Sequence, residues 1–429
     1  MSVSQRRQTL DSEYVKIGGA AVSGNQAICN FKEHCEIFAC QPQSNYSSIM
    51  SGNNNNYIDI SIRGIPVDQV KLLAFEFNII NSGATGNLEL LNPNLWLASN
   101  GIELKADGNI IQTHYSESLM FDAEYLTDEA RSIYSGFMGN VYPSSFMNRN
   151  TSGAAPLQVL TPGQSAYFYL PITSSIFQVA KLPLCAVNSD LVYRLYFNSF
   201  SNCVASTNTA TTLLVNSLQL IIGGQTRGDG FKFDCSALAA DISASYYVPE
   251  KFAYQFGTQA PGTPLKATTN ALANGLYSSI IFFARAQSPI QEQVMQWLYS
   301  GVSPYTPTNF KFQSATLNSS NSLPYGLANI NPNVITYANM IMSSDNDQIL
   351  FSTFPELFNY VKYSFGPSNW EDQRQGNCVG VRLDNSWNYN LQLPANFVSP
   401  STGVEVCYVA SRLYEAKLDR NGRLTSVPQ

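Results

Sequence analysis

The stretch GVEVCYVASRLYEAKLDRNGRLTS, residues 403–426, contains a long run of strand-forming residues that ends in charged ones. In the middle of the run, apolar side chains occupy both faces of the strand, which is typical of a strand buried on both sides. The pattern therefore predicts the last strand of a packed sheet. We expect the residues after it, 419–429, to form a charged tail that leaves the sheet and can contact another surface.

Short segments of the same kind recur along the whole chain, separated by clusters of Gly, Pro, Asn and Ser. This pattern predicts strands and turns throughout, so we expect an all-β chain. Examples are YIDISI (57–62), VKLLAFEFNII (70–80), LVYRLYF (191–197), TLLVNSLQLII (212–222), GLYSSIIFFARA (275–286) and NYNLQL (388–393).

Helical signals are few. SPIQEQVMQWLYSG (288–301) combines a capping box with one apolar face, and FPELFNYVKYSFGP (354–367) ends at a Gly-Pro pair. A shorter segment, 127–136, is a third candidate. We expect these helices only to cover the strands.

The segment GGQTRGDG, residues 223–230, holds four glycines and predicts a linker. The two halves beside it follow one plan, with many short strands, one or two helices and a long last strand. That plan predicts two tandem eight-stranded jelly rolls with a few short helices and long loops. The expected parts are an N-terminal arm (1–30), a first jelly roll (31–224), a linker (225–245), a second jelly roll (246–418) and a C-terminal tail (419–429).

The composition limits the classes of function. Hydrophobic residues make up 44 % of the chain and charged residues only 13 %, against about 25 % in typical soluble domains. A surface of Asn, Ser, Gln and Thr suits a protein covered by copies of itself, or an extracellular β-protein. The net charge of −6, and the absence of any basic run longer than Arg6-Arg7, argue against nucleic-acid coating and sequence-specific nucleic-acid binding.

The cysteines and the first residues of the chain indicate where the protein folds. The eight cysteines form no C-x-x-C pair, which favours reduced thiols in a protein folded in a cytoplasm. The start, MSVSQRRQTLDSEY, has a basic pair but no apolar run after it, so we expect no signal peptide. No apolar stretch is long enough to predict a membrane span.

The chain contains only weak candidates for catalytic or metal-binding residues. Of the two histidines, His34 and His114, the first lies among three cysteines in CNFKEHCEIFAC (29–40). The spacing of Cys29, Cys35 and Cys40 is unusual for zinc, so we expect thiols in an alternating strand and neither a metal nor a cofactor.

Two further motifs invite a functional interpretation that we do not favour. Asp345 and Asp347 could hold a divalent cation, but a polar loop is the simpler reading. The tripeptide Arg227-Gly228-Asp229 matches an integrin-recognition motif, and we interpret it as coincidence within a glycine-rich segment.

Several segments together resemble a known family. NWEDQRQGNCVGVRLD (369–384), NYNLQLPANFV (388–398) and the last strand follow one another as in the C-terminal part of tectivirus-type double jelly-roll major capsid proteins, from tailless, membrane-containing icosahedral phages. KLPLCAVNSDLVYRLYFNSF (181–200) and LWLASNGIELKADGNIIQTHY (95–115) are similar to segments of that family's first jelly roll. These matches cover about a third of the chain and include no invariant signature.

The resemblance implies a structural, non-enzymatic role in a virion. Three chains would form a homotrimer of pseudo-hexagonal outline, which tiles an icosahedral shell around the genome and around an internal lipid membrane. Neighbouring capsomers, penton proteins and minor capsid proteins would be its partners. The loops 120–155 and 318–350 would rise outward. Arg6, Arg7 and Lys16 of the arm would face the interior and meet anionic lipid, unless the arm touches nothing.

Two alternatives stay open at this point. Double jelly rolls also build glycan-active enzymes such as peptide-N-glycanase-like amidases, for which Asp234, Asp241 and Glu250 are the candidate carboxylates. A receptor-binding virion protein, such as a spike or penton, is the other alternative.

Overall fold

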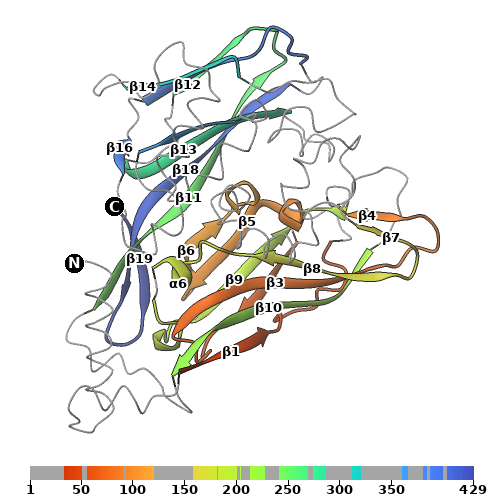
Figure 1. The fold of residues 1–429 in the computed structure, drawn as a ribbon, viewed down its shortest axis with the longest axis vertical. Helices are drawn as coiled ribbons and strands as arrows, with labels where there is room; N and C mark the ends of the chain where they lie inside the picture. Colours follow the sequence, from red (N-terminus) through yellow and green to blue (C-terminus); the bar gives the residue numbers. More distant parts are fainter. Residues whose placement is uncertain are drawn as a thin grey trace.

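The computed structural model describes residues 33–50, 56–90, 93–119, 158–180, 182–200, 203, 213–227, 241–268, 274–286, 312–319, 360–365, 380–383, 387–399 and 403–429. The described part is composed almost entirely of antiparallel strands, arranged as two jelly rolls (Figure 1). Within it, no helix is long and apolar enough to cross a membrane.

The first jelly roll consists of two four-stranded sheets, in the orders β1-β10-β3-β8 and β2-β9-β5-β6, with a separate pair, β4-β7. Its first strand pairs with its last, and its second strand with the one before the last, as a jelly roll requires. The strands are β1 (Glu33–Cys40), β2 (Asn56–Ser61), β3 (Gln69–Asn81), β4 (Leu88–Leu90), β5 (Leu97–Ala106), β6 (Asn109–His114), β7 (Gln158–Leu160), β8 (Ser165–Pro171), β9 (Leu191–Phe197) and β10 (Leu213–Arg227). Short helical turns are η1 (Pro93–Trp96), α6 (Ile176–Val179) and η2 (Leu184–Ala186).

The second jelly roll repeats this order. One sheet runs β11-β18-β13-β15, with β16 beside β13 and β19 beside β18, and the other runs β12-β17-β14. The strands are β11 (Ile242–Gly257), β12 (Pro264–Thr268), β13 (Gly275–Ala286), β14 (Ser314–Ser319), β15 (Tyr360–Ser364), β16 (Val381–Leu383), β17 (Trp387–Gln392), β18 (Val404–Leu418) and β19 (Leu424–Pro428).

Alternation in the sequence places one face of a strand in the core, as β9 shows. In β9, LVYRLYF, the odd residues from Leu191 to Phe197 are buried and the residues between them are half-buried. Aromatic side chains fill both cores at edge-to-face or tilted angles. Phe77 and Trp96 do so in the first jelly roll, and Phe282 and Tyr389 in the second.

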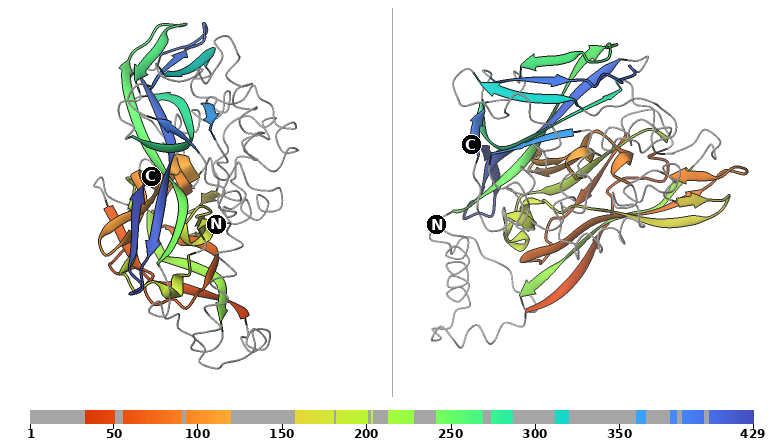
Figure 2. Two further views of the ribbon diagram at one scale, coloured as in Figure 1. Left: turned by 90° about the vertical axis from the view of Figure 1, so that its left-hand side faces the viewer. Right: turned by 45° about the horizontal axis from the view of Figure 1, so that its top comes forward.

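The two jelly rolls share part of one core. The lower halves of β11 and β18 run past the first jelly roll, with β19 beside them (Figures 1 and 2). Side chains from all three strands belong to the core of the first jelly roll: Ala244, Tyr246, Val248, Ala416, Leu418 and Leu424. The boundary between the jelly rolls is therefore a packed interface.

The predicted helix over 354–367 is wrong where the structure describes it. Tyr360–Ser364 is strand β15, which pairs with β13. Four of its five residues are buried, which places side chains of both strand faces inside, and its Tyr-Val-Lys-Tyr sequence has high strand propensity. The predicted helices 127–136 and 288–301 lie outside the described residues.

The predicted linker, 225–245, begins too early and ends too late. Strand β10 continues to Arg227, with Gln225 paired to Gln69 and Cys35, and β11 begins at Ile242. The linker was predicted from its glycines, but Gly224 lies within β10, where a glycine allows the neighbouring strand β3 to approach closely. A Cβ atom there would collide with the Gln69 backbone.

The predicted free tail, 419–429, is also wrong, because Leu424–Pro428 folds back as β19 against the end of β18. The turn between them is built by Asp419, whose Oδ1 accepts hydrogen bonds from the backbone N–H groups of Asn421 and Arg423, both at 2.8 Å. Gly422 adopts a φ of 74°, which favours glycine. The Asn421-Gly422 pair is the hairpin signal that the prediction missed.

Candidate functional site between the two jelly rolls

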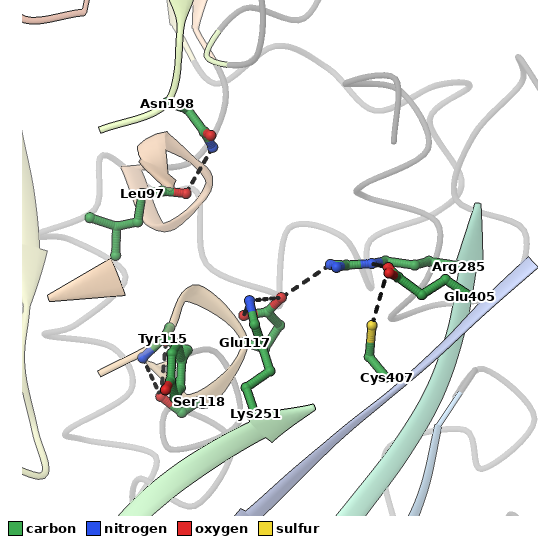
Figure 3. A network of polar contacts seen from close by, with 9 residues as sticks. All are labelled: Leu97, Tyr115, Glu117, Ser118, Asn198, Lys251, Arg285, Glu405 and Cys407. Carbon is green, nitrogen blue, oxygen red and sulfur yellow. Dashed lines mark hydrogen bonds and ion pairs between the residues drawn. The ribbon is translucent and has the colours of Figure 1, made fainter. Parts of the chain in front are cut away.

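A network of charged side chains joins the two jelly rolls (Figure 3). Glu117, in a helical turn after β6, accepts hydrogen bonds from Nζ of Lys251 on β11 and from Nη1 of Arg285 on β13, each at 3.1 Å. The Glu117 side chain is only 5 % exposed. This carboxylate of the first jelly roll therefore holds two cations of the second.

A second carboxylate balances the charge. Arg285 Nε donates to Oε2 of Glu405 on β18 at 2.7 Å, and Arg285 and Glu405 are direct neighbours in the β13–β18 register. Burial raises the pKa of Glu117, but the opposing effects of Lys251 and Arg285 outweigh it, so its pKa lies below the ordinary value. Glu117 therefore stays ionised at neutral pH, and the network pairs two carboxylates with two basic side chains.

A separate cluster immobilises Glu250, on β11. Its carboxylate accepts hydrogen bonds from the Tyr277 hydroxyl at 2.9 Å and from Nη1 of Arg412 at 3.2 Å. The Tyr414 hydroxyl donates to the same carboxylate at 3.4 Å. All three donors come from strands of the same sheet, so Glu250 ties β11, β13 and β18 together.

Within the apolar core that the two jelly rolls share, the hydroxyl of Tyr246 makes hydrogen bonds to both. This hydroxyl, on a fully buried side chain, donates to the Ile111 carbonyl at 2.7 Å and lies 2.6 Å from Oγ of Ser426. Because the carbonyl can only accept, the Ser426 hydroxyl donates to Tyr246. The two hydrogen bonds join β6 of the first jelly roll, β11 of the second and the C-terminal strand β19.

The C-terminal hairpin is fastened to the first jelly roll as well. The Asn188 backbone N–H donates to the Gly422 carbonyl at 2.7 Å, and the Asn188 side chain donates to the Asn421 carbonyl at 2.8 Å. Close by, the Leu424 backbone N–H donates to Oγ of Ser189 at 3.0 Å. The last residues of the chain therefore help to fix the angle between the jelly rolls.

Of the candidate carboxylates of an enzyme, the two that the structure describes, Asp241 and Glu250, lie far apart. Asp241 is exposed just before β11, and Glu250 lies nine residues further along the same strand direction, about 30 Å away at ~3.3 Å per residue. In addition, the Glu250 carboxylate already accepts hydrogen bonds from Arg412 and two tyrosines. Asp234 lies outside the described residues. The described geometry therefore favours no carboxylate-based active site.

The described part of the cysteine-histidine segment is strand β1, Glu33–Cys40, which includes His34, Cys35 and Cys40. Cys35 is exposed and lies five residues from Cys40, so the two thiols point to opposite faces of the strand. Across the described residues, no group of three or more His, Cys, Asp or Glu side chains could hold a metal ion.

The remaining predicted site residues are placed only in part. Arg6, Arg7, Lys16, Cys29, Asp345 and Asp347 lie outside the described residues. Arg227 is the last residue of β10, and the Gly and Asp that follow it are also outside. His114 is fully buried at the end of β6, with Nδ1 3.5 Å from the Ser174 hydroxyl.

Sequence reasoning missed the charged network. A signal was available, because Arg285 and Glu405 are single charges inside apolar strand segments, IIFFARA and VEVCYV. A buried charge in such a segment needs a partner. The partner Glu117 is 168 residues from Arg285, so the sequence could not show which residue it is.

The architecture is that of double jelly-roll viral major capsid proteins, which confirms the all-β double jelly-roll expectation. VP54 of PBCV-1, fitted into a reconstruction of the virophage Sputnik, superposes with a TM-score of 0.62 at 12 % identity, over 92 % of this chain and 97 % of that one. The Faustovirus major capsid protein superposes with a TM-score of 0.54 at 8 % identity, over 96 % and 97 %.

A structure of the Sputnik virophage itself gives a TM-score of 0.56 at 11 % identity, over 92 % of this chain and 88 % of that one. Neither a protein-family model nor the sequence of a curated protein matches the chain. At these identities the similarity defines the fold, and the role in a virion is an inference from it.

Proposed function

We propose that this chain is a major capsid protein whose homotrimers, pseudo-hexagonal in outline, tile an icosahedral shell around a viral genome. The observation that carries the proposal is the coverage of the fold match. Nearly the whole chain, 92 %, superposes on nearly the whole of PBCV-1 VP54, 97 %. The superposition therefore includes both jelly rolls and their relative placement. A match to a single jelly roll would not give this coverage.

The charge distribution supports the same role. Only 13 % of residues are charged, and the buried charges between the jelly rolls are neutralised inside the chain. An uncharged, hydrogen-bonding surface is suited to large contacts with neighbouring copies. The separation of Asp241 from Glu250, and the pairing of Glu250 with Arg412, support a structural role over a carboxylate-based catalytic one.

The test is the native mass of the purified chain, by light scattering on a sizing column at micromolar concentration. We expect a stable species of three chains with a hexagonal outline in electron micrographs. A clean monomer at all concentrations would overturn the proposal and return attention to the enzyme and receptor-binding alternatives. Synthesis in the host cytoplasm and contacts with penton and minor capsid proteins belong to the same proposal.

The N-terminal arm supplies a further part of the proposal, a contact with an internal membrane through Arg6, Arg7 and Lys16. Each basic residue near an anionic surface contributes about 1 kcal/mol. Changing all three to Gln should release the protein from phosphatidylserine vesicles in a flotation assay, and neutral vesicles should bind neither form. The matched control changes three exposed basic residues elsewhere, Arg63, Lys266 and Arg420, to Gln. Equal loss in both variants would exclude a specific role for the arm.

A further inference from the structure

One short stretch of the first jelly roll, residues 111–119, carries two of its contacts with the second jelly roll. The Ile111 carbonyl accepts a hydrogen bond from the Tyr246 hydroxyl at 2.7 Å. Further along the stretch, the Glu117 carboxylate holds two cations of the second jelly roll, each at 3.1 Å. His114 lies midway between these two contacts in the chain. A displacement of His114 therefore acts on both of them.

His114 is enclosed within the first jelly roll. Its side chain is fully buried, and the residue lies directly opposite Ile102 of β5 in the strand register. Nδ1 is 3.5 Å from the Ser174 hydroxyl oxygen, and Nε2 has no hydrogen-bond partner among the described residues. The site suits a neutral imidazole. An imidazolium there would be a buried cation with two N–H donors, which is costly unless an anion meets it.

The ionisable groups near His114 do not compensate such a charge. Glu103 alternates with Ile102 on β5, so it points to the other face of the sheet, where it pairs with Lys105 at 2.9 Å. Helix α6 contributes no charged side chain. Other ionisable residues of the surrounding elements are Tyr115 and Glu117 on the same turn, Tyr193 on β9, and Tyr246, Glu250 and Lys251 on β11. Burial alone lowers the pKa of His114, so none of these groups stabilises an imidazolium.

The turn after β6 connects His114 rigidly to Glu117. Within it, the Tyr115 backbone N–H donates to Oγ of Ser118 at 2.9 Å, and the Leu119 backbone N–H donates to the Tyr115 carbonyl at 3.0 Å. Leu119 is buried in the core of the first jelly roll. The turn is thus fixed at one end by His114 and at the other by Leu119. Removing His114 from its site therefore moves the carboxylate that lies between them.

We propose that residues 111–119 form an acid-sensitive latch between the two jelly rolls, here called the junction latch, which opens when His114 takes up a proton. In the open form His114 reaches water, the turn leaves its place and Glu117 releases its two partners. The core of the second jelly roll and most of the first stay packed, so opening is local and does not require unfolding of the chain. The latch lies within a single chain and does not depend on the proposed trimer.

The size of the effect follows from the pKa of His114 in the two forms. Burial lowers it to about 3 in the closed form, and an exposed imidazole has a value near 6.5. Between these values the open form binds a proton and the closed form does not, so acid favours opening. From pH 7.5 to 5.0 the opening equilibrium shifts about thirtyfold.

Glu117 does not open the latch by losing its own charge in this pH range. Burial raises the pKa of Glu117, but the two cations outweigh this effect and keep the pKa below its ordinary value. The carboxylate is therefore still ionised at pH 5.0. His114 is the group on the latch whose protonation differs between the closed and the open form.

Two buried thiols of the chain can report on the latch. The Cys407 thiol donates to Oε2 of Glu405 at 3.4 Å, inside the charged network that Glu117 completes (Figure 3). Cys203 lies in the core of the first jelly roll, so it reports unfolding of that core. A dipyridyl disulfide labels thiols in mild acid as well as at neutral pH, and peptide mass spectrometry shows which cysteine has reacted.

The experiment compares the labelling of Cys407 in the wild type and in His114→Gln at pH 7.5 and 5.0. The ratio of the two rates at each pH cancels the titration of the thiol itself. We expect this ratio to rise about thirtyfold between the two pH values, by a route that low concentrations of urea do not accelerate. The other histidine of the chain supplies the control, because His34→Gln should behave as the wild type does.

Two results would overturn the proposal. The first is a ratio that does not change with pH. The second is labelling of Cys407 and Cys203 at the same rate with the same urea dependence, since both thiols then react only through global unfolding. If circular dichroism shows that His114→Gln is unfolded, His114→Asn replaces it, with the same expected rise. A monomeric wild type would count against the proposed function and leave these labelling results as they stand.

Discussion

The carboxylate of Glu117, in the first jelly roll, lies 3.1 Å from Nζ of Lys251, in the second, and both side chains are largely buried. Arg285 completes the arrangement from β13. Contacts between separate domains are commonly small and polar, and they permit relative motion. Here a buried ionic network, a shared apolar core and a C-terminal hairpin fix one jelly roll against the other. Such rigidity suits a building block of constant shape.

Replacing Glu117 by Gln should destabilise the protein by about 3 kcal/mol. The substitution keeps the side-chain volume but leaves Lys251 and Arg285 with an uncompensated buried charge. Urea unfolding at fixed protein concentration measures the change in the free energy of unfolding.

The matched control is Glu415→Gln, which removes a half-buried carboxylate whose partners are Lys417, 3.9 Å away, and the side-chain amide of Gln429, 3.0 Å away. Both partners lie at the surface and such pairs contribute little, so we expect a change below about 0.5 kcal/mol. If both variants lose the same stability, the network does not hold the jelly rolls together.

Replacing Tyr246 by Phe should cost about 1.5 kcal/mol of stability. The change removes one oxygen and leaves the Ile111 carbonyl and the Ser426 hydroxyl without their shared partner in a buried site. Thermal unfolding by circular dichroism provides the measurement. Tyr254→Phe is the control, because Tyr254 is 52 % exposed, and an equally large effect there would contradict the argument.

Replacing Leu424 by Ala should cost about 3 kcal/mol, although the residue lies near the end of the chain. Leu424 is 2 % exposed and belongs to the core of the first jelly roll, so truncation leaves a cavity. Val427→Ala, in the same strand but 48 % exposed, should change stability by less than about 0.5 kcal/mol. Chemical denaturation of both variants separates a packed C-terminal strand from a free tail, for which neither change would matter.

Alternation and turn residues predicted many strands correctly. The segment 191–197 was predicted as a strand and is β9, Leu191–Phe197, because one face is apolar at every second position. The predicted strand 388–393 overlaps β17, Trp387–Gln392, in the same way. The period-two pattern is local, so a sequence displays it without knowledge of any partner strand.

Long-range pairing explains what the sequence could not show. Strand β19 is short and weakly apolar, and it forms because Leu424 finds a place in the core of a jelly roll that begins about 390 residues earlier in the chain. Likewise, the apolar spacing over 354–367 predicted a helix, but Tyr360–Ser364 is strand β15 because it pairs with β13, which is distant in the sequence. The charged residues between the jelly rolls can be suspected from their apolar surroundings, but their partners are set by the packing of the two halves.

Acidification should weaken the folded protein through His114. Burial lowers the pKa of this side chain to about 3, whereas the unfolded chain has a value near 6.5. The folded state therefore binds no proton between these values while the unfolded state does. The free energy of unfolding must then fall by about 1.4 kcal/mol for each pH unit below 6.5, until the pH reaches about 3.

The His114→Gln variant isolates this contribution, because it removes the titrating group and keeps a polar side chain near the Ser174 hydroxyl. Between pH 7.5 and 5.0, urea unfolding of the wild type should lose about 2 kcal/mol more than that of the variant, since 1.5 pH units lie below 6.5. Glu117, whose pKa is lowered, also loses stability as the pH falls, but it does so in both proteins. Parallel pH profiles for the two proteins would show that His114 titrates normally in the folded state and is accessible to water.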